Sequence, residues 1–117
     1  MDARKLAGRE AEARCAEYLR ERGYKILAMN YACRGGEIDI IAARGGYVAF
    51  VEVKLRASDS FAAAREAVTP AKQRRIRLAA LTWLAAHDCA LQPRFDVIEI
   101  YTGGREHRLN HLENAFE

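Results

Sequence analysis

The sequence has little of what marks membrane, secreted or low-complexity proteins. Its 117 residues include only two prolines and eight glycines, too few for a collagen-like or low-complexity chain. No apolar run approaches the ~18–20 residues that a membrane span needs. The first ten residues lack the apolar segment of a secretory signal. We therefore expect a soluble cytosolic (cytoplasmic) protein with no membrane partner.

Cysteine is also scarce. Cys15, Cys33 and Cys89 are widely spaced and form no CxxC pair, so neither a structural zinc site nor a disulfide framework is expected. We predict reduced thiols that partly fill the core. His107 and His111 are four residues apart but lack a helical context, so we do not expect them to bind a metal.

The composition favours one globular domain over residues 1–117. Hydrophobic residues make up 50% of the chain and charged residues 30%, which is enough apolar material for one packed core. The formal net charge is +3. Residues 61–90 nevertheless carry five basic and two acidic side chains, and such a basic segment permits contact with phosphate groups.

Apolar periodicity predicts an α/β fold. A helix is expected over about residues 3–22, ending at Gly23. A second helix should begin at Thr69, as N-cap, and Pro70. Residues 57–68 are interpreted as a loop with room for a short helix. Strands are expected over residues 24–31, 37–43, 47–55 and 94–101, with a short final strand near 106–110. This α-β-β-β-α-β order predicts a central mixed β-sheet flanked by helices.

The strongest chemical signal lies in the hairpin around residues 45–46, two glycines that suit a tight turn. If Arg44 faces Tyr47, then Asp39 lies directly opposite Glu52, with Cβ atoms about 4.5–5.5 Å apart. Because side chains alternate along a strand, one hairpin face would be wholly apolar, including Ile38, Ile40 and Ala42. The other face would carry Glu37, Asp39, Ile41, Phe50, Glu52 and Lys54.

Two facing carboxylates destabilise a sheet unless a cation relieves their repulsion. Mg²⁺ or Mn²⁺ would do so, because both prefer hard oxygen ligands. Lys54, on the same face, could then reach a phosphate oxygen or a metal-bound water. The alternative is a solvated hairpin face on which Glu37 and Lys54 form a surface ion pair.

Glu12 is the one acidic residue on the apolar stripe of the first helix. At about 100° per residue it lies within about 20° of Leu19, whereas Glu10, Glu17 and Glu21 point to solvent. A buried carboxylate needs a partner. That partner is either a basic side chain or the metal site, to which Glu12 would add a third acidic group.

This pattern of a helix glutamate, Asp39 after Ile38, and Glu52-Val53-Lys54 resembles the PD-(D/E)xK signature of the restriction-endonuclease-like superfamily. More closely, the chain resembles the bacterial YraN-like family, which is similar to archaeal Holliday junction resolvases. The resemblance spans about residues 8–116 and is carried by GEIDIIA at 36–42, FVEVK at 50–54, KQRR at 72–75 and RFDV at 94–97.

The resemblance implies a restriction-endonuclease-like fold and a nuclease that uses Mg²⁺ or Mn²⁺ to hydrolyse phosphodiester bonds, in branched or junction DNA. Asp39 and Glu52 would be metal ligands, with the Val53 carbonyl as a candidate third. Lys54 would orient or deprotonate the attacking water. Glu12 would ligate the metal directly or through water, and Gln73 is a weaker candidate for a polar role beside the lysine.

Three positions depart from the pattern. Ala11 stands where the family often has glycine before the helix glutamate, Ile38 replaces the proline of the superfamily signature, and Leu55 stands where the family often has threonine. None of these departures removes a catalytic group. Leu55 could alter the loop that meets the substrate.

Seven basic residues are candidates for contacts with a nucleic-acid backbone. Those early in the second helix lie at the end where cations oppose the helix dipole, so helix stability does not explain them. A solvated face is the alternative for each. Asp96 and Trp83 are interpreted as structural. The candidates are Arg9, Arg34, Arg56, Lys72, Arg74, Arg75 and Arg77.

Three functions compete at this point. The first is a metal-dependent nuclease, and the second is a non-catalytic nucleic-acid-binding module on the same fold. The third is a protein-interaction subunit whose acidic hairpin is only a salt-bridged surface. Cleavage of both strands of a symmetric junction would suit a two-fold homodimer, although the sequence presents no clear interface stripe.

Overall fold

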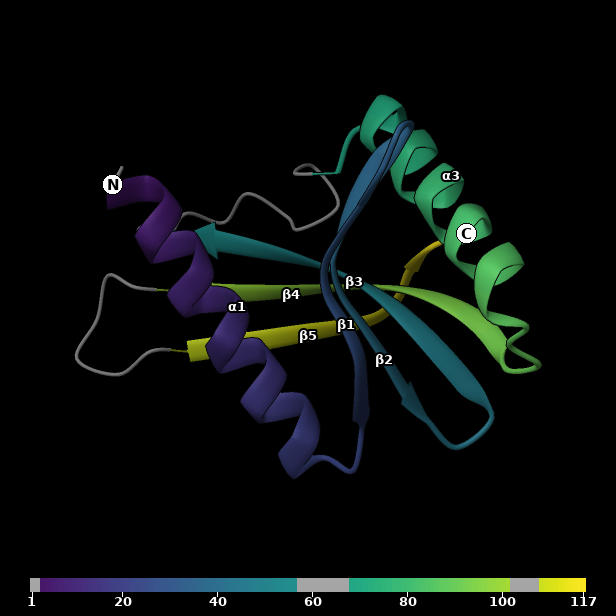
Figure 1. Ribbon diagram of the computed structural model, residues 1–117. Helices are drawn as coiled ribbons and strands as arrows, with labels where there is room; N and C mark the ends of the chain where they lie inside the picture. The colour runs from purple at the N-terminus through teal and green to yellow at the C-terminus, as the bar shows by residue number, and fades with distance from the viewer. Residues whose placement is uncertain (1–2, 57–67, 102–107) are drawn as a thin grey trace.

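A five-stranded mixed sheet lies between two helices in the computed structural model, which describes residues 3–56, 68–101 and 108–117 (Figure 1). The helices are α1 (Ala3–Glu21) and α3 (Pro70–His87). The strands follow the order β1-β2-β3-β4-β5 across the sheet. They are β1 (Lys25–Cys33), β2 (Gly36–Arg44), β3 (Tyr47–Arg56), β4 (Gln92–Tyr101) and β5 (Arg108–Phe116).

The pairing of β3 with β4 is parallel, and every other neighbouring pair is antiparallel. Parallel neighbours need a crossover connection, and α3 lies in the segment that joins these two strands. The predicted mixed α/β architecture and element order are therefore confirmed. The predicted loop over 57–68 lies almost wholly outside the described residues. Neither described helix is long and apolar enough to cross a membrane.

The last strand is longer than predicted. Instead of a short strand near 106–110, β5 extends to Phe116, which pairs with Phe95 of β4. The stretch after residue 110 is polar and has weak strand propensity. It becomes a strand because β4 supplies a template for its backbone and because the Asn114 N–H donates to Asp96 Oδ1 at 3.0 Å.

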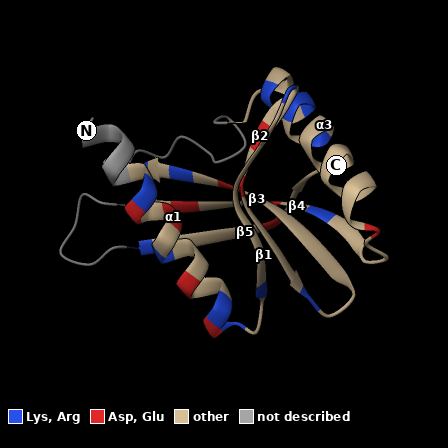
Figure 2. Ribbon diagram, in the orientation of Figure 1, with Lys and Arg blue, Asp and Glu red and all other residues tan. Residues whose placement is uncertain are grey.

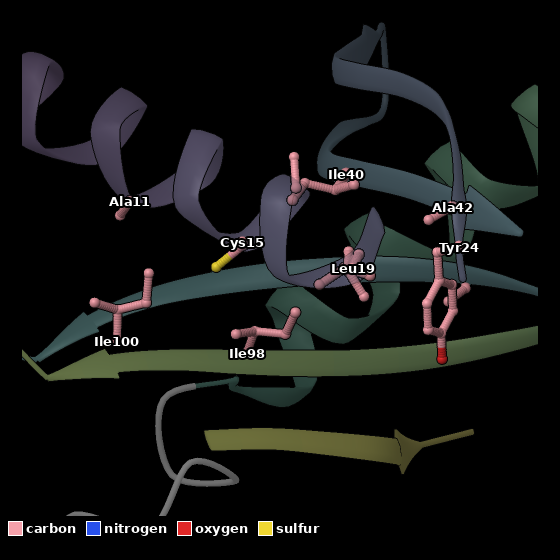
Figure 3. Packing of buried hydrophobic residues seen from close by; sticks show 11 residues of the cluster. Ala11, Cys15, Leu19, Tyr24, Ile40, Ala42, Ile98 and Ile100 are labelled. Carbon is pink, nitrogen blue, oxygen red and sulfur yellow. The ribbon is translucent and has the colours of Figure 1, made fainter. Parts of the chain in front are cut away.

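Each face of the sheet carries a cluster of buried apolar side chains. On the face that α1 covers, the α1 face, Ala11, Cys15 and Leu19 of the helix point toward Ile98 and Ile100 of β4 (Figure 3). On the opposite face, the α3 face, Phe50 packs against Trp83 in an edge-to-face contact. Burial on both sides explains the continuous apolar runs of β2 and β3.

The predicted wholly apolar hairpin face is wrong at Ile38. Ile40 packs on the α1 face, whereas Ile38 belongs to the α3-face cluster together with Ile41. Regular alternation would put Ile38 and Ile40 on the same side. The irregularity coincides with Asn30 of β1, which has a φ of 52° and lies between the residues that pair with Ile38 and Ile40.

Helix α3 begins as the sequence predicts. Thr69 is the N-cap, its Oγ1 accepts a hydrogen bond from the Lys72 N–H at 3.2 Å, and Pro70 follows. The turn between β1 and β2 packs closely on this helix. A Cβ at Gly36 would lie 2.4 Å from the Arg75 carbonyl oxygen, so only glycine permits this approach. The β1–β2 turn is thereby held against the basic first half of α3.

Asp96 anchors β4, β5 and α1 in one polar network. Its carboxylate is fully buried and accepts hydrogen bonds from Arg94 and His111, while the Tyr18 hydroxyl is hydrogen bonded to His111 at 3.1 Å. Burial alone would raise the pKa of Asp96, but the bonds from His111, Arg94 and the Asn114 N–H outweigh it and lower that pKa.

We expect Asp96→Asn to lower the free energy of unfolding by about 3 kcal/mol, because it leaves Arg94 without its buried counter-charge. A carboxyl whose pKa is lowered by folding stabilises the fold above its unfolded pKa, and this stability is lost as the pH falls through the folded value. Urea unfolding at several pH values measures both effects. Equal stability of variant and wild type at pH 7 would contradict the assigned role.

Candidate functional site

The hairpin register is as predicted from the turn to Ile40 and Val51, the last pair before the acidic residues. Arg44 pairs with Tyr47, and the recorded pairs continue to Ile40 and Val51. One residue further, the sequence predicts Asp39 directly opposite Glu52. The structure instead shows Asp39 Oδ2 accepting a hydrogen bond from the Val53 backbone N–H at 2.8 Å.

Glu52 lies on the α3 face and is only 7% exposed. Its Oε1 contacts two ammonium groups, Lys72 Nζ of α3 at 2.6 Å and Lys54 Nζ at 3.4 Å. Lys54 therefore pairs with Glu52, and not with Glu37 as in the surface ion-pair alternative. A buried carboxylate between two lysines is a compact charged centre in a low-dielectric setting, where electrostatic effects are large.

The two acidic residues of the hairpin nevertheless influence each other strongly. Burial, followed by the negative charge of Glu52, raises the pKa of Asp39 to about 7; the Val53 N–H opposes this shift, and Glu12 adds to it. The same negative charges act on the thiol of Cys15. Burial, and then the charges of Asp39 and Glu12, raise its pKa to about 12. Three carboxylates from three elements thus concentrate negative charge at one end of the sheet.

Glu12 approaches this centre from α1. It is half-buried and faces the side-chain amide of Asn30 in β1. With the amide nitrogen turned toward it, Asn30 donates to both Glu12 oxygens, at 3.1 and 3.0 Å. The predicted inward position of Glu12 is thus confirmed. Its partner Asn30 is the residue of β1 that has a positive φ.

The two lysines respond differently to their surroundings. Burial, together with the neighbouring Lys72, lowers the pKa of Lys54. Burial also acts to lower the pKa of Lys72, but its hydrogen bonds to Glu52 and Lys54 and the negative charges of Glu52 and Asp39 together outweigh burial and raise it. Lys54 is therefore the lysine that gives up a proton more readily, and Lys72 is the one bound more firmly as a cation.

A cleft of about 740 Å³ opens between the β1–β2 turn and the first turns of α3. Glu52 and Lys72 line it, together with Arg34 and Arg75 from opposite sides. Figure 2 shows how basic positions crowd the first half of α3. The cleft thus joins the buried acidic centre to cationic walls that suit a phosphate-containing ligand.

The other sequence candidates are distributed more widely. Gln73 donates from its side chain to the Val68 carbonyl at 3.0 Å and so supports the start of α3 rather than the lysines. Arg77 donates to the Glu117 carbonyl. Arg9 on α1 and Arg74 on α3 are exposed, and neither is among the residues that line the cleft.

Sequence reasoning missed Glu99. This β4 residue is only 2% exposed, and its carboxylate accepts hydrogen bonds from Arg56 at 3.3 Å and Asn110 at 3.0 Å. It pairs with Lys54 across the β3–β4 ladder. The signal that could have revealed it is a lone acid between Ile98 and Ile100, because a charge inside an apolar strand requires partners.

The donor set fits a divalent cation in chemical type. Two carboxylates and a backbone carbonyl, those of Asp39, Glu52 and Val53, are hard oxygen donors. Their mutual repulsion is the conflict that a cation relieves. In the side-chain arrangement described, however, no group of three or more His, Cys, Asp or Glu residues is placed to hold a metal. The ammonium group of Lys72 lies against Glu52 instead.

These features define a small mixed α/β protein with a buried acidic centre beside a basic cleft. The chain belongs to the family described as "Uncharacterised protein family UPF0102", whose model matches residues 11–100. This confirms the resemblance to the YraN-like family.

Two relatives illustrate the match. The chain is 47% identical to a UPF0102 protein of Geobacter metallireducens, over 97% of this chain and 93% of the relative. It is 42% identical to a UPF0102 protein of Pelotomaculum thermopropionicum, over 98% of each chain. These names state no activity.

We expect Asp39→Asn to raise the free energy of unfolding at neutral pH by about 1–3 kcal/mol, because the neutral amide ends both the burial of a charge and its repulsion by Glu52. A carboxyl whose pKa folding raises stabilises the fold below its unfolded pKa, and this stability is lost as the pH rises through about 7. Wild-type stability should therefore fall between about pH 4 and pH 7 more steeply than that of the variant.

Chemical denaturation across that pH range tests this, with Asp88→Asn as the matched control. Asp88 is exposed and has a φ of 43°, a conformation that asparagine also adopts. Identical pH profiles of the Asp39 variant and wild type would show that the carboxylates do not interact as described.

Proposed function

We propose that this protein is a metal-dependent nuclease with a restriction-endonuclease-like fold, which hydrolyses phosphodiester bonds in branched DNA. One observation carries the proposal. Burial and the nearby charge of Glu52 raise the pKa of Asp39 to about 7, and Glu52 itself lines a cleft together with Arg34, Lys72 and Arg75. A fold selected only for stability would not keep such a pair.

Each group has a role in this proposal. Asp39, Glu52 and the Val53 carbonyl would hold the cation, with Glu12 near enough to act directly or through water. Mg²⁺ or Mn²⁺ bound there would supply Lewis-acid polarisation of a phosphoryl oxygen and a more acidic water. Lys54, whose pKa is lowered, would orient that water and offset negative charge that develops on the phosphate.

The cleft would position the substrate. Its three basic residues come from two elements that close glycine packing holds together, the β1–β2 turn and α3. Arginine and lysine side chains at fixed positions bind phosphate groups and set the register of a nucleic-acid strand without reading its sequence. Similarity to PD-(D/E)xK nucleases and archaeal Holliday junction resolvases, which the motif residues suggest, agrees with such a substrate.

Glu52→Gln should abolish cleavage and weaken Mn²⁺ binding at least ten-fold, because it removes one anionic ligand. We would titrate Mn²⁺ into the pure protein and then assay cleavage of a labelled four-way junction and a matched duplex. Glu17→Gln, which changes an exposed glutamate of α1, is the control and should behave as wild type.

If wild type cleaves and Glu52→Gln retains full activity, the site assignment is wrong. Metal-independent binding of DNA without cleavage would instead favour the second candidate, a non-catalytic nucleic-acid-binding module. The contact between Lys72 and Glu52 favours that candidate, because an ammonium group already neutralises the carboxylate.

Lys72→Met separates the two candidates. In a nuclease, Lys72 competes with the cation for Glu52, so its removal should tighten Mn²⁺ binding by roughly three- to ten-fold, while DNA binding weakens. In a binding module, DNA affinity falls and Mn²⁺ binding stays absent. Arg74→Met is the control, since Arg74 is exposed on the same helix and does not line the cleft.

A further inference from the structure

Strand β1 breaks its regular alternation at Asn30. Ala28 and Tyr31 both pack on the α3 face, whereas side chains three residues apart on a regular strand point to opposite faces. Between them, Asn30 has a φ of 52°, a left-handed conformation that few residue types other than glycine adopt. Its side chain is turned toward α1, where it faces Glu12.

The break lies beside Asp39 of the neighbouring strand. Asn30 lies between the β1 residues that pair with Ile38 and Ile40. Asp39 lies between those two isoleucines, so it is level with Asn30 across the ladder. The alternation of β2 is interrupted at the same place, since Ile38 and Ile40 pack on opposite faces of the sheet. Asn30 is therefore part of the acidic centre by position, although it carries no charge.

Glu12 interacts with both of these residues. The Asn30 amide nitrogen lies 3.1 and 3.0 Å from the two Glu12 oxygens. Burial and the charge of Glu52 have the larger effects on the raised pKa of Asp39, and Glu12 adds its charge and a side-chain hydrogen bond to them. One amide thus holds both oxygens of a carboxylate next to a second carboxylate that repels it.

An amide is chemically suited to hold this carboxylate. Glycine would adopt the positive φ more readily than asparagine, so the backbone alone does not require an amide side chain here. A lysine would hold Glu12 but would also neutralise it, as Lys72 does with Glu52. An amide N–H donates without a charge that competes with a cation. Metal sites regularly contain such outer partners, which fix the direction of a ligand.

We propose that Asn30 is a positioning residue, which aims the Glu12 carboxylate at the cation held by Asp39 and Glu52. This inference rests on the proposed function and adds a residue to its site. Asn30 acts through Glu12 and touches neither the cation nor the DNA.

The test measures the Mn²⁺ affinity of wild type, Asn30→Gly, Glu12→Gln and the double variant, by electron paramagnetic resonance of the free ion. Asn30→Gly keeps the positive φ and removes the amide. It should weaken Mn²⁺ binding about ten-fold, as the loss of an outer partner of a ligand does. In the Glu12→Gln background the same change should have no further effect, because Asn30 acts only through Glu12.

Asn114→Gly is the matched control. Asn114 is also exposed, also has a φ of 52°, and lies in β5 at the other edge of the sheet. This variant should bind Mn²⁺ as wild type does. Thermal unfolding verifies that each variant is folded.

Two further measurements separate positioning from a general structural role. Glu12→Asp keeps the charge but draws the carboxylate back by one carbon, so it should lose about as much Mn²⁺ affinity as Asn30→Gly. It also keeps the test valid if Asn30→Gly fails to fold. Binding of a labelled junction in EDTA should be unchanged in Asn30→Gly, because Asn30 does not line the cleft.

Unchanged Mn²⁺ affinity of Asn30→Gly or Glu12→Asp, an equal loss in the Glu12→Gln background, or weaker junction binding by Asn30→Gly in EDTA would overturn the inference and leave the nuclease proposal standing. Failure of wild type to bind Mn²⁺ would overturn both. Mn²⁺ binding that depends on Asn30 through Glu12, without cleavage of DNA, would support the inference and contradict only the nuclease.

Discussion

One hydrogen bond, from the Val53 backbone N–H to the Asp39 carboxylate, determines how the site end of the sheet is built. Pairing between β2 and β3 is recorded as far as Ile40 and Val51, and beyond it the side chain takes the place of a ladder partner. A buried N–H must be satisfied, and this bond satisfies it without a β2 carbonyl. The next residue back, Glu52, points to the α3 face, where it contacts Lys72 of α3.

Asp96 and Asp39 have opposite electrostatic surroundings. Asp96 is surrounded by donors from Arg94, His111 and the β5 backbone, and its pKa is lowered. Asp39 accepts a hydrogen bond from the Val53 N–H, but burial and the charges of Glu52 and Glu12 raise its pKa. The first arrangement stabilises the protein. The second costs stability, and the cost is localised beside the cleft, which is where strained electrostatics are expected if they serve a ligand.

Local sequence signals were sufficient for the elements whose geometry is set locally. The glycine pair at 45–46 fixes the hairpin register, and Thr69 with Pro70 places the start of α3, because turn and cap chemistry depend on adjacent residues. The partner of Glu52 could not be predicted in this way, since Lys72 is remote in sequence and its contact depends on how α3 packs. The length of β5 and the displacement of Ile38 likewise depend on neighbouring strands.

Strand β1 lies at an edge of the sheet, where unpaired backbone groups can recruit a strand of another molecule. Leu27 and Met29 on this strand are more than one-third exposed, so a flat edge here would favour association with another molecule. A register shift between Ile26 and Ala28 and the positive φ of Asn30 prevent flatness, because such irregularities bend a strand and interrupt its pairing pattern. The asparagine that faces Glu12 thus also contributes to the irregular edge, a feature that disfavours edge-to-edge pairing.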